Sequence, residues 1–193
     1  MQRLELSTQA DGVLESAAKA LLAGGVAIFP TDTVYGIGAL PQHSAALERI
    51  YKLKDRPLGM PLPLLISDIA QVRTISSFES ESLHLLSKAF WPGPLTLVLP
   101  DASKPSNSFV AQDGTIAVRS PDHAFIQSLC KLVGPIAATS ANLHGEPTPL
   151  QISGMPKAFE AVDLMIDGGE CSYGAASTIL DLSKERIEVL REG

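Results

Sequence analysis

Short runs of apolar residues alternate along the chain with longer segments in which apolar residues recur every three or four positions. The short runs favour β-strands and the longer segments favour helices. Strands are predicted at Leu4–Leu6, Val26–Phe29, Leu62–Ile66, Leu95–Leu99, Thr115–Val118, Ile136–Ala138, Leu164–Ile166, Ser177–Leu182 and Ile187–Leu190. Helices are predicted at Ala10–Leu22, Ala45–Leu53, Ser80–Phe90 and Ala124–Val133. Strands alternating with helices predict an α/β fold.

The ends of the predicted helices carry residue types that start and stop helices. Thr8 is a suitable N-cap for the first helix, and Gly24 follows its last turn. The third helix ends at a Trp-Pro-Gly-Pro sequence, because proline cannot continue a helix. Segments 101–114 and 142–157 are rich in turn residues and are expected to be loops. Long loops often cover a site, although an idle surface loop has the same composition.

No segment of the sequence divides the chain or repeats, so residues 1–193 are expected to form a single domain. Apolar residues make up 45% of the chain, which is enough for a sizeable core. The formal charge of −6 disfavours non-specific binding to nucleic acid or anionic membranes, so a basic site must be a local pocket. No apolar run reaches the roughly 18 residues of a membrane span, and no signal peptide is visible. A soluble, cytoplasmic protein is the expectation.

Several common cofactor and catalytic motifs are missing from the sequence. There is no phosphate-binding Gly-x-x-x-x-Gly-Lys-Ser/Thr loop, no dinucleotide-binding Gly-x-Gly-x-x-Gly and no Gly-x-Ser-x-Gly elbow. The segment Gly36-Ile37-Gly38 is too short to count and is interpreted as turn glycines. The sequence therefore indicates neither a known nucleotide-binding loop nor a serine nucleophile.

Cysteine and histidine positions do not predict a metal site. Cys130 and Cys171 fit no metal spacing, and Cys130 lies in an apolar run that predicts a buried thiol. Zinc is unsupported because the histidines are isolated and are expected at the surface or at helix ends. They are His43, His84, His123 and His144.

Two pairs of polar residues point to a small-molecule site. Lys54 and Arg56 follow a predicted helix, and Ser140 and Asn142 follow a predicted strand. In extended backbone, residues two positions apart face the same side, so each pair can aim both side chains into one cavity. Cations suit phosphates and carboxylates, whereas Ser and Asn suit neutral polar groups. The alternative for the cations is a simple interaction with the helix dipole.

Other polar residues also stand at or beside predicted strand ends. Thr31, Thr33 and Tyr35 alternate after a buried strand, although hydroxyl groups there often only satisfy turn backbone. Arg119 and Arg191 each end an apolar run, and Ser177 opens one. Open α/β sheets bind ligands at strand ends, so the set together favours a ligand site.

The order of these motifs resembles the YrdC-type threonylcarbamoyl-adenylate synthases over about residues 10 to 192. The motifs are Pro30-Thr31-Asp32-Thr33-Val34-Tyr35-Gly36, Lys54-x-Arg56-Pro57, Trp91-Pro92-Gly93-Pro94-Leu95-Thr96, Ala117-Val118-Arg119, Thr139-Ser140-Ala141-Asn142 and Ser177-Thr178. The resemblance implies a twisted, mixed α/β sheet with flanking helices around a large open cavity. It also implies the short, single-domain form of the family, without the C-terminal domain of longer members.

The resemblance implies an enzyme that joins L-threonine, bicarbonate and ATP to give L-threonylcarbamoyladenylate and pyrophosphate. The product feeds threonylcarbamoyl modification of tRNA adenosine 37 by downstream transfer machinery. By resemblance, Lys54 and Arg56 are expected to be catalytic. The positions that match threonine contacts are Thr33, Arg119, Ser140 and Ser177. The positions that match ATP contacts are Arg56, Met60, Thr115, Asn142 and Arg191.

Three positions differ from many relatives of the family. Met60 replaces an asparagine, so only its main chain is expected to contact ATP. Leu65 replaces a histidine, which removes a polar side chain from that position. Asp55 replaces a glycine between the two cations and leaves their spacing intact.

The reaction that the resemblance implies fits these residue types. A carbamate formed from threonine and bicarbonate attacks the α-phosphorus of ATP, which needs alignment and charge neutralisation but no enzyme nucleophile. Mg²⁺ is expected to arrive with ATP, since the sequence shows no carboxylate cage for it.

Three alternatives remain open from the sequence. An RNA-binding module is disfavoured by the acidic charge, so tRNA binding is expected to be weak. A carbamoyl-transfer domain like that of hydrogenase-maturation proteins normally sits in a longer, cysteine-rich chain. A relative that uses another amino acid is compatible with Met60 and Leu65.

Overall fold

The computed structural model describes residues 1–6, 10–57, 60–100 and 109–193. The described strands are β1 (Gln2–Glu5), β2 (Ala27–Phe29), β3 (Gly36–Ala39), β4 (Leu64–Leu65), β5 (Leu95–Pro100), β6 (Ala111–Gln112), β7 (Thr115–Arg119), β8 (Ile136–Ser140), β9 (Leu164–Asp167), β10 (Thr178–Asp181) and β11 (Glu188–Arg191). The described helices are α1 (Ala10–Leu22), α2 (Ser44–Lys54), α3 (Glu81–Phe90) and α4 (Ala124–Val133). Short 3₁₀ helices are η1 (Ile69–Thr74), η2 (Ile152–Gly154) and η3 (Lys157–Ala161).

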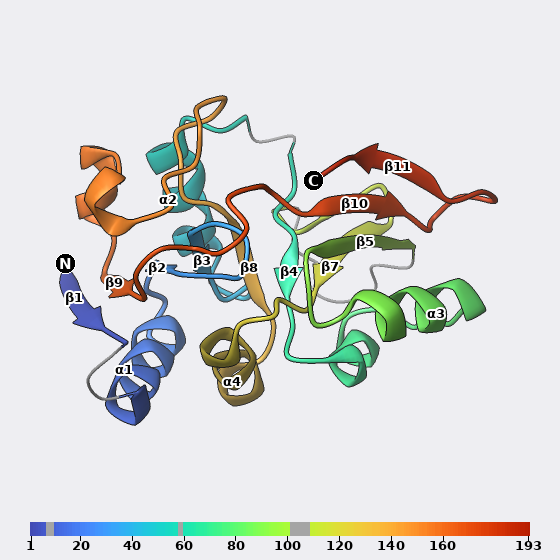
Figure 1. The fold of residues 1–193 in the computed structure, drawn as a ribbon, viewed down its shortest axis with the longest axis horizontal. Coiled ribbons are helices and arrows are strands. Elements are labelled where there is room, and N and C mark those ends of the chain that lie inside the picture. The colour runs from blue at the N-terminus through green and yellow to red at the C-terminus, as the bar shows by residue number, and fades with distance from the viewer. Residues whose placement is uncertain (7–9, 58–59, 101–108) are drawn as a thin grey trace.

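The strands form one mixed sheet in the order β1-β9-β2-β3-β8-β4-β7-β5-β10-β11, with β6 pairing on β7 (Figure 1). Strands β1, β2 and β9 pair in parallel, as do β4 with β7 and β5 with β10. Strand β3 runs antiparallel to both β2 and β8. The predicted α/β fold with a mixed sheet is confirmed.

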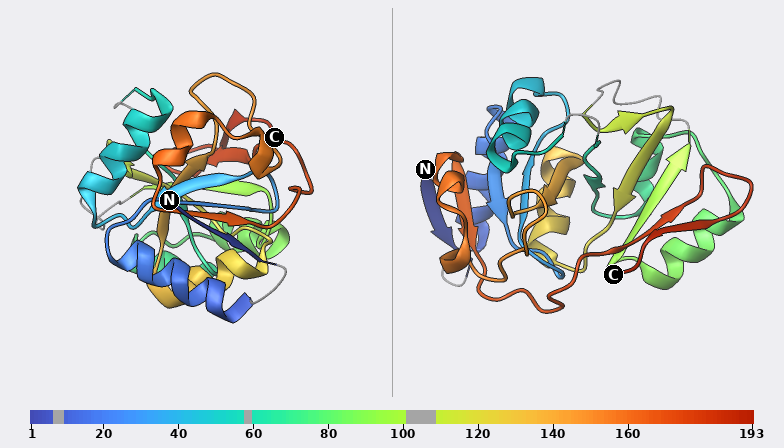
Figure 2. Two further views of the ribbon diagram at one scale, coloured as in Figure 1. Left: turned by 90° about the vertical axis from the view of Figure 1, so that its left-hand side faces the viewer. Right: turned by 90° about the horizontal axis from the view of Figure 1, so that it is seen from above.

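Helices cover the sheet on two sides, and each side has its own apolar cluster. Helix α2 lies on one side, whereas α1 and α4 lie together on the other (Figures 1 and 2). Ile50 of α2 belongs to the first cluster with Ile37 and Leu64. Leu129 of α4 belongs to the second cluster with Leu65. Leu64 and Leu65 of β4 therefore pack in different clusters, because successive side chains of a strand point to opposite faces of the sheet.

Each predicted strand and helix has a counterpart, with bounds that shift by a few residues. Thr8, the predicted N-cap, lies outside the described residues, as do residues 101–108 of the first predicted loop. Strand β6 follows in the described part of that loop, and η2 lies within the second predicted loop. The 3₁₀ helices, β3 and β6 are additions to the predicted elements.

The interpretation of Gly36-Ile37-Gly38 as turn glycines is wrong. These residues form most of β3, which is fully buried between β2 and β8. A Cβ atom on Gly38 would lie 2.8 Å from the carbonyl oxygen of Ala137 and 3.0 Å from the ring of Phe29. Glycine is present because neighbouring groups approach closely, not because the chain turns.

Within the described residues, none of the helices combines the length and the apolar character that a membrane crossing requires.

Candidate functional site

Lys54 is the last residue of α2, and its side chain is buried beneath the end of β8. Its ammonium group donates to the main-chain oxygens of Ser140 and Asn142, each at 2.5 Å, and to Asn142 Oδ1 at 3.2 Å. Three acceptors match the three N–H donors of an ammonium group. Lys54 therefore fastens the end of α2 to the segment that follows β8.

Ser140 and Asn142 meet one another as the sequence predicts. The hydroxyl group of Ser140 donates to Asn142 Oδ1 at 2.5 Å. The amide nitrogen of Asn142 donates to the carbonyl oxygens of Leu143 and Glu146, which shapes the following turn. The predicted meeting of Lys54 with this pair is confirmed.

Burial, and to a smaller extent the nearby charge of Arg56, lowers the pKa of Lys54 to about 8. Desolvation disfavours the charged form of an amine, and a neighbouring cation acts in the same direction. The acceptors around Lys54 are uncharged oxygens, so no carboxylate offsets these effects. Lys54 loses its proton much more readily than an exposed lysine.

Arg56 bonds to a different segment from Lys54, and the backbone between the two residues is not extended. Asp55 has a φ of 51° in the left-handed region and ends the helix. The guanidinium group of Arg56 lies 5.9 Å from the centre of the Tyr51 ring. It donates to the carbonyl oxygens of Met60 and Pro61 at 3.2 and 3.3 Å. The premise of extended backbone between the two cations is therefore wrong, and a cavity shared by both side chains stays a prediction.

Met60 is engaged through its main chain. Its carbonyl oxygen also accepts a hydrogen bond from the hydroxyl group of Tyr51 at 2.7 Å, while its side chain is 41% exposed.

Thr115 begins β7, at the other end of the strand from Arg119. By the rise of an extended strand these two residues lie about 13 Å apart. Thr115 is therefore not part of the arginine cluster described next.

Arg119, at the end of β7, lies in a second polar cluster. Its guanidinium group donates to the carbonyl oxygen of Gly93 at 3.0 Å, to Thr33 Oγ1 at 2.9 Å and to Asp32 Oδ1 at 2.5 Å. Burial lowers the pKa of Arg119, whereas the Asp32 carboxylate raises it. The neighbouring Thr31 hydroxyl donates to the carbonyl oxygen of Val34 and satisfies the turn. The contact between Thr33 and Arg119 joins two predicted threonine-contacting positions.

A third cluster connects the sheet edge with the end of the chain. The hydroxyl groups of Ser177 and Thr96 lie 2.8 Å apart. Arg191 Nε and Nη2 donate to the carbonyl oxygen of Ser177 at 3.0 and 2.7 Å. The charge of Arg191 also contributes to the lowered pKa of Arg119, so the second and third clusters are electrostatically connected.

Two residues of these clusters were not predicted to be site residues. Asp32 is the charged partner of Arg119, and Thr96 is the hydrogen-bond partner of Ser177. Both residues lie inside the sequence motifs named above. Asp32 stands between Thr31 and Thr33, and a carboxylate in that position could have indicated a site residue. Nothing in the sequence alone shows that Thr96 faces Ser177.

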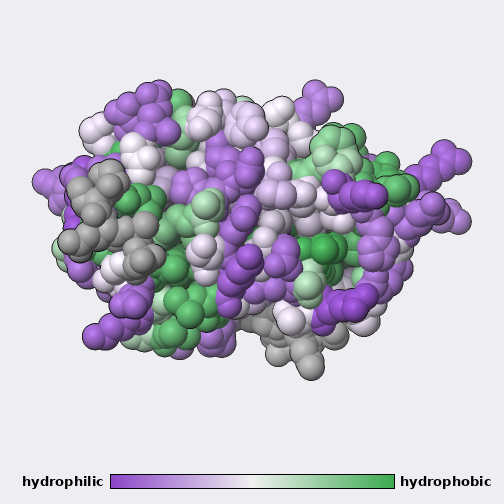
Figure 3. Space-filling model, turned by 60° about the horizontal axis from the view of Figure 1, so that its bottom comes forward, coloured by the Kyte–Doolittle hydropathy of each residue, from purple (hydrophilic) through white to green (hydrophobic). Residues whose placement is uncertain are grey.

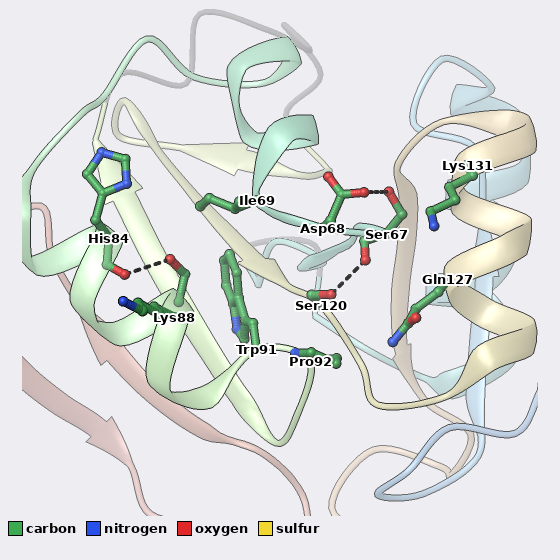
Figure 4. A pocket seen from close by; sticks show the side chains of 11 residues that line it. Ser67, Asp68, Ile69, His84, Lys88, Trp91, Pro92, Ser120, Gln127 and Lys131 are labelled. Atoms are coloured by element: carbon green, nitrogen blue, oxygen red, sulfur yellow. Dashed lines mark hydrogen bonds between the residues drawn. The ribbon is translucent and has the colours of Figure 1, made fainter.

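One pocket of the described residues lies away from these clusters. It has a volume of about 610 Å³ and lies between α3, α4 and the β4–η1 segment, with Lys88, Trp91 and Lys131 in its walls (Figure 4). Figure 3 shows the molecule from its lower side, where hydrophilic residues separate apolar patches. No predicted site residue lines this pocket. A cavity shared by Lys54, Ser140 and Asn142 stays a prediction.

Comparison with known proteins gives a consistent set of relatives. The Sua5/YciO/YrdC family model, described as "Telomere recombination", matches residues 19–193. Threonylcarbamoyl-AMP synthase of Bacillus subtilis is 39% identical over 98% of the chain, which covers 55% of that protein. The chain spans about half the length of the first curated relatives it matches.

Solved structures of the same kind have similar folds. Sua5 of Pyrococcus abyssi in complex with L-threonine superposes with a TM-score of 0.88 and 34% identity. The match covers 98% of this chain and 56% of that one. YciO of E. coli superposes with a TM-score of 0.87 and 26% identity, and the match covers 100% of this chain and 94% of that one.

Proposed function

Because the chain belongs to the Sua5/YciO/YrdC family, we propose that it is a threonylcarbamoyl-AMP synthase. The proposed reaction joins L-threonine, bicarbonate and ATP into L-threonylcarbamoyladenylate and releases pyrophosphate. The product then serves the threonylcarbamoyl modification of adenosine 37 in tRNA, by way of separate transfer machinery. We expect the reaction to take place in the cytoplasm.

One observation supports the proposal most directly. Lys54 meets Ser140 and Asn142 although these residues are 86 and 88 positions away in the sequence. The contact assembles a cation, a hydroxyl group and an amide at one place. These are suitable groups for a substrate that carries an amino acid and a nucleotide.

The chemistry requires charge neutralisation and alignment. In the proposed reaction, the threonine amine and bicarbonate form a carbamate, and a carbamate oxygen attacks the α-phosphorus while the P–O bond to pyrophosphate breaks. Arg119 and Arg191 are suitable partners for carboxylate or phosphate, because a planar guanidinium fork can bind either in a bidentate manner. Lys54 holds Ser140 and Asn142 in place and adds positive charge beside them.

Magnesium is expected to enter as part of the substrate Mg·ATP. Within the described ranges, no three His, Cys, Asp or Glu side chains lie close enough together to hold a metal ion. A resident metal site built from these side chains is therefore not part of the proposal.

The test is incubation of the purified protein with ATP, Mg²⁺, labelled bicarbonate and L-threonine. We expect pyrophosphate and a labelled adenylate that form only when all four are present. Omission of threonine or bicarbonate is the internal control. Pyrophosphate release that is independent of both would contradict the proposal.

A second candidate is the same chemistry with another amino acid. Leu65 stands at the position where many relatives of the family have a histidine. It is buried among apolar residues that include Ile126 and Ile136. That position therefore offers no polar side chain to a substrate. A panel that includes serine, alanine and valine beside threonine distinguishes the two candidates by the rate of pyrophosphate release.

A further inference from the structure

The pocket between α3 and α4 is large enough for a small organic molecule and is built from four segments of the chain. Its volume of about 610 Å³ lies within the range of ligand-binding cavities. Its walls come from the β4–η1 segment, from α3 and the two residues after it, from Ser120 after β7, and from α4 (Figure 4). None of the predicted site residues lines it, so the pocket is separate from the three polar clusters.

Hydrogen bonds between the four segments hold the pocket walls together. The main-chain nitrogen of Gly93, just after α3, donates to the carbonyl oxygen of Ser120 at 2.8 Å. The hydroxyl group of Ser120 donates to the carbonyl oxygen of Ser67 at 2.9 Å. The side chain of Gln71 in η1 donates to the carbonyl oxygen of Cys130 in α4 at 2.8 Å. The pocket is therefore part of the connected fold and not a gap between independent elements.

Each of the two helices carries a lysine on the side that lines the pocket. Lys88 and Trp91 are one helical turn apart at the end of α3, and Lys88 lies in the last turn. Gln127 and Lys131 are one turn apart on α4. Both lysine side chains are exposed, so a molecule that enters the pocket can reach their ammonium groups.

The pocket has an excess of positive charge, because its lysines have no partners. Most lysine and arginine side chains of the described ranges bond to a carboxylate or a carbonyl oxygen, but neither Lys88 nor Lys131 does so there. The carboxylate in the lining belongs to Asp68, whose oxygens accept from Ser67 Oγ at 3.0 Å and from the Ala70 nitrogen at 2.9 Å. In a chain of net charge −6, this local excess of positive charge favours an anion.

Trp91 gives the pocket a flat apolar wall. Its indole nitrogen donates to the carbonyl oxygen of Leu95 at 2.6 Å, which fixes the ring and uses its only donor. Ile69 and Pro92 line the pocket beside it (Figure 4). In the same view Lys131 lies on the wall opposite Trp91. A planar ring can pack against the indole while an acidic substituent reaches toward α4.

From this charge and shape we infer that the pocket binds a small aromatic carboxylate, with its ring against Trp91 and its anionic group at Lys131. An ammonium group forms charge-assisted hydrogen bonds with a carboxylate, and Lys88 adds positive charge from the facing helix. The carbonyl oxygen of Gly93 accepts from Arg119, so the end of α3 also touches the arginine cluster. The bound ligand therefore lies beside that cluster without occupying it.

The experiment uses the single tryptophan of the chain, whose indole N–H signal in NMR spectra belongs to Trp91 and reports on the pocket directly. Isotopically labelled protein is titrated with benzoate, with its neutral isostere benzamide, with its cationic isostere benzamidine, and with acetate, which lacks the ring. We expect benzoate to shift the indole signal and to bind at least about threefold tighter than each of the others. Higher ionic strength is expected to weaken benzoate binding and to leave benzamide binding unchanged.

Variants assign the binding to the two lysines. Lys131→Met removes the charge and keeps the length of an exposed side chain, and it is expected to weaken benzoate binding about two- to fivefold. The double variant Lys88→Met/Lys131→Met is expected to bind benzoate no better than benzamide. Lys157→Met is the matched control, since Lys157 is an exposed lysine on η3 that does not line the pocket, and it is expected to bind as the wild type does.

Two results would overturn the inference. One is equal affinity of the wild type for benzoate and benzamide. The other is unchanged benzoate affinity in the double variant, which would leave the two lysines serving only the C-terminal ends of their helices. Neither measurement needs catalytic turnover, so the outcome is independent of the proposed enzymatic function.

Discussion

The ammonium group of Lys54 hydrogen-bonds to both the main-chain oxygen and the side-chain oxygen of Asn142. A third bond reaches the carbonyl oxygen of Ser140, so every N–H of the ammonium group has an acceptor within the protein. Lys54 thus supports a polar segment, and in the proposed function its positive charge lies beside that segment. The lysine of the Lys54-x-Arg56 motif therefore has a structural role, which an exposed lysine would not have.

Lys54→Ala is expected to abolish most adenylate formation while the fold remains intact. The change removes a positive charge and frees Ser140 and Asn142 from their common donor. Lys52→Ala on the same helix is the control, because the Lys52 side chain is 79% exposed. We expect at least a hundredfold loss of pyrophosphate release in the first variant and less than a twofold change in the second. Near-normal turnover by folded Lys54→Ala would contradict the proposed role.

The lowered pKa of Lys54 predicts a defined dependence on pH. The folded-state pKa is about 8, below the ordinary value of 10.5, so the unfolded chain holds more protons between these pH values. The contribution of Lys54 to the free energy of unfolding therefore rises as pH increases from about 8 to 10.5. Below about pH 8 both states are protonated and this contribution is constant.

Two measurements check this dependence. The ¹³C signal of Lys54 Cε is expected to titrate near pH 8 and to be missing from Lys54→Met. Urea unfolding at pH 8 and pH 10 is expected to show the wild type gaining stability relative to that variant. Adenylate formation is expected to fall over the same range, because the charged form is lost. A Lys54 pKa near 10 would refute the argument.

Ser140→Ala is expected to weaken threonine binding more than ATP binding. The variant removes one hydroxyl group, whereas Asn142 keeps its bond from Lys54. The loss of a single hydrogen bond costs roughly 0.5–1.5 kcal/mol, which predicts a rise of about two- to thirteenfold in the threonine Kd. Calorimetric titrations of the two ligands measure the difference, with the exposed Ser153→Ala as the control. Equal weakening of both ligands would argue against a threonine contact.

Gly38→Ala is expected to destabilise the sheet. The added methyl group would lie 2.8 Å from the Ala137 carbonyl oxygen and 3.1 Å from the Ala138 Cβ atom. Overpacking of this kind costs about 1–3 kcal/mol, and here the nearest atom belongs to a strand backbone that cannot swing away. Urea unfolding measures the cost. A midpoint equal to that of the wild type would show that β3 and β8 can separate without loss.

The long elements were predictable because their apolar patterns are strong. Helix α4 matches its predicted range at both ends, and β7 differs by one residue at one end. Strand β3 was missed because Gly36-Ile37-Gly38 has low strand propensity, and only the packing of Phe29 and Ala137 makes the glycines suitable there. Contacts between residues far apart in the sequence, such as Gly38 with Ala137, cannot be read from the local pattern of apolar residues.

The candidate site was predictable in its residue types but only partly in its geometry. The motif order indicated that Lys54, Ser140 and Asn142 meet, and they do. Lys54 and Arg56 bond to different segments on either side of Asp55, whose left-handed conformation the residue spacing could not predict. The partnership of Asp32 with Arg119 depends on strands that lie far apart in the sequence.

Arg119→Lys is expected to cost both stability and threonine affinity. The guanidinium group bonds Gly93, Thr33 and Asp32 at once, from three nitrogen atoms with fixed directions. A lysine ammonium is a single point of charge and cannot reach all three acceptors. The buried Asp32 carboxylate then loses part of its compensation, which predicts a loss of about 2–4 kcal/mol in the free energy of unfolding.

The matched control is Arg73→Lys, since the Arg73 side chain is 78% exposed in its pair with Glu79. Surface pairs contribute little, so this change is expected to alter stability by less than about 0.5 kcal/mol. Urea unfolding and threonine calorimetry of both variants separate the two effects, because Arg119→Lys is expected to lower threonine affinity even at temperatures where it is fully folded. If Arg119→Lys and Arg73→Lys proved equally mild in both measurements, Arg119 would be neither the support of Asp32 nor a partner of the threonine carboxylate.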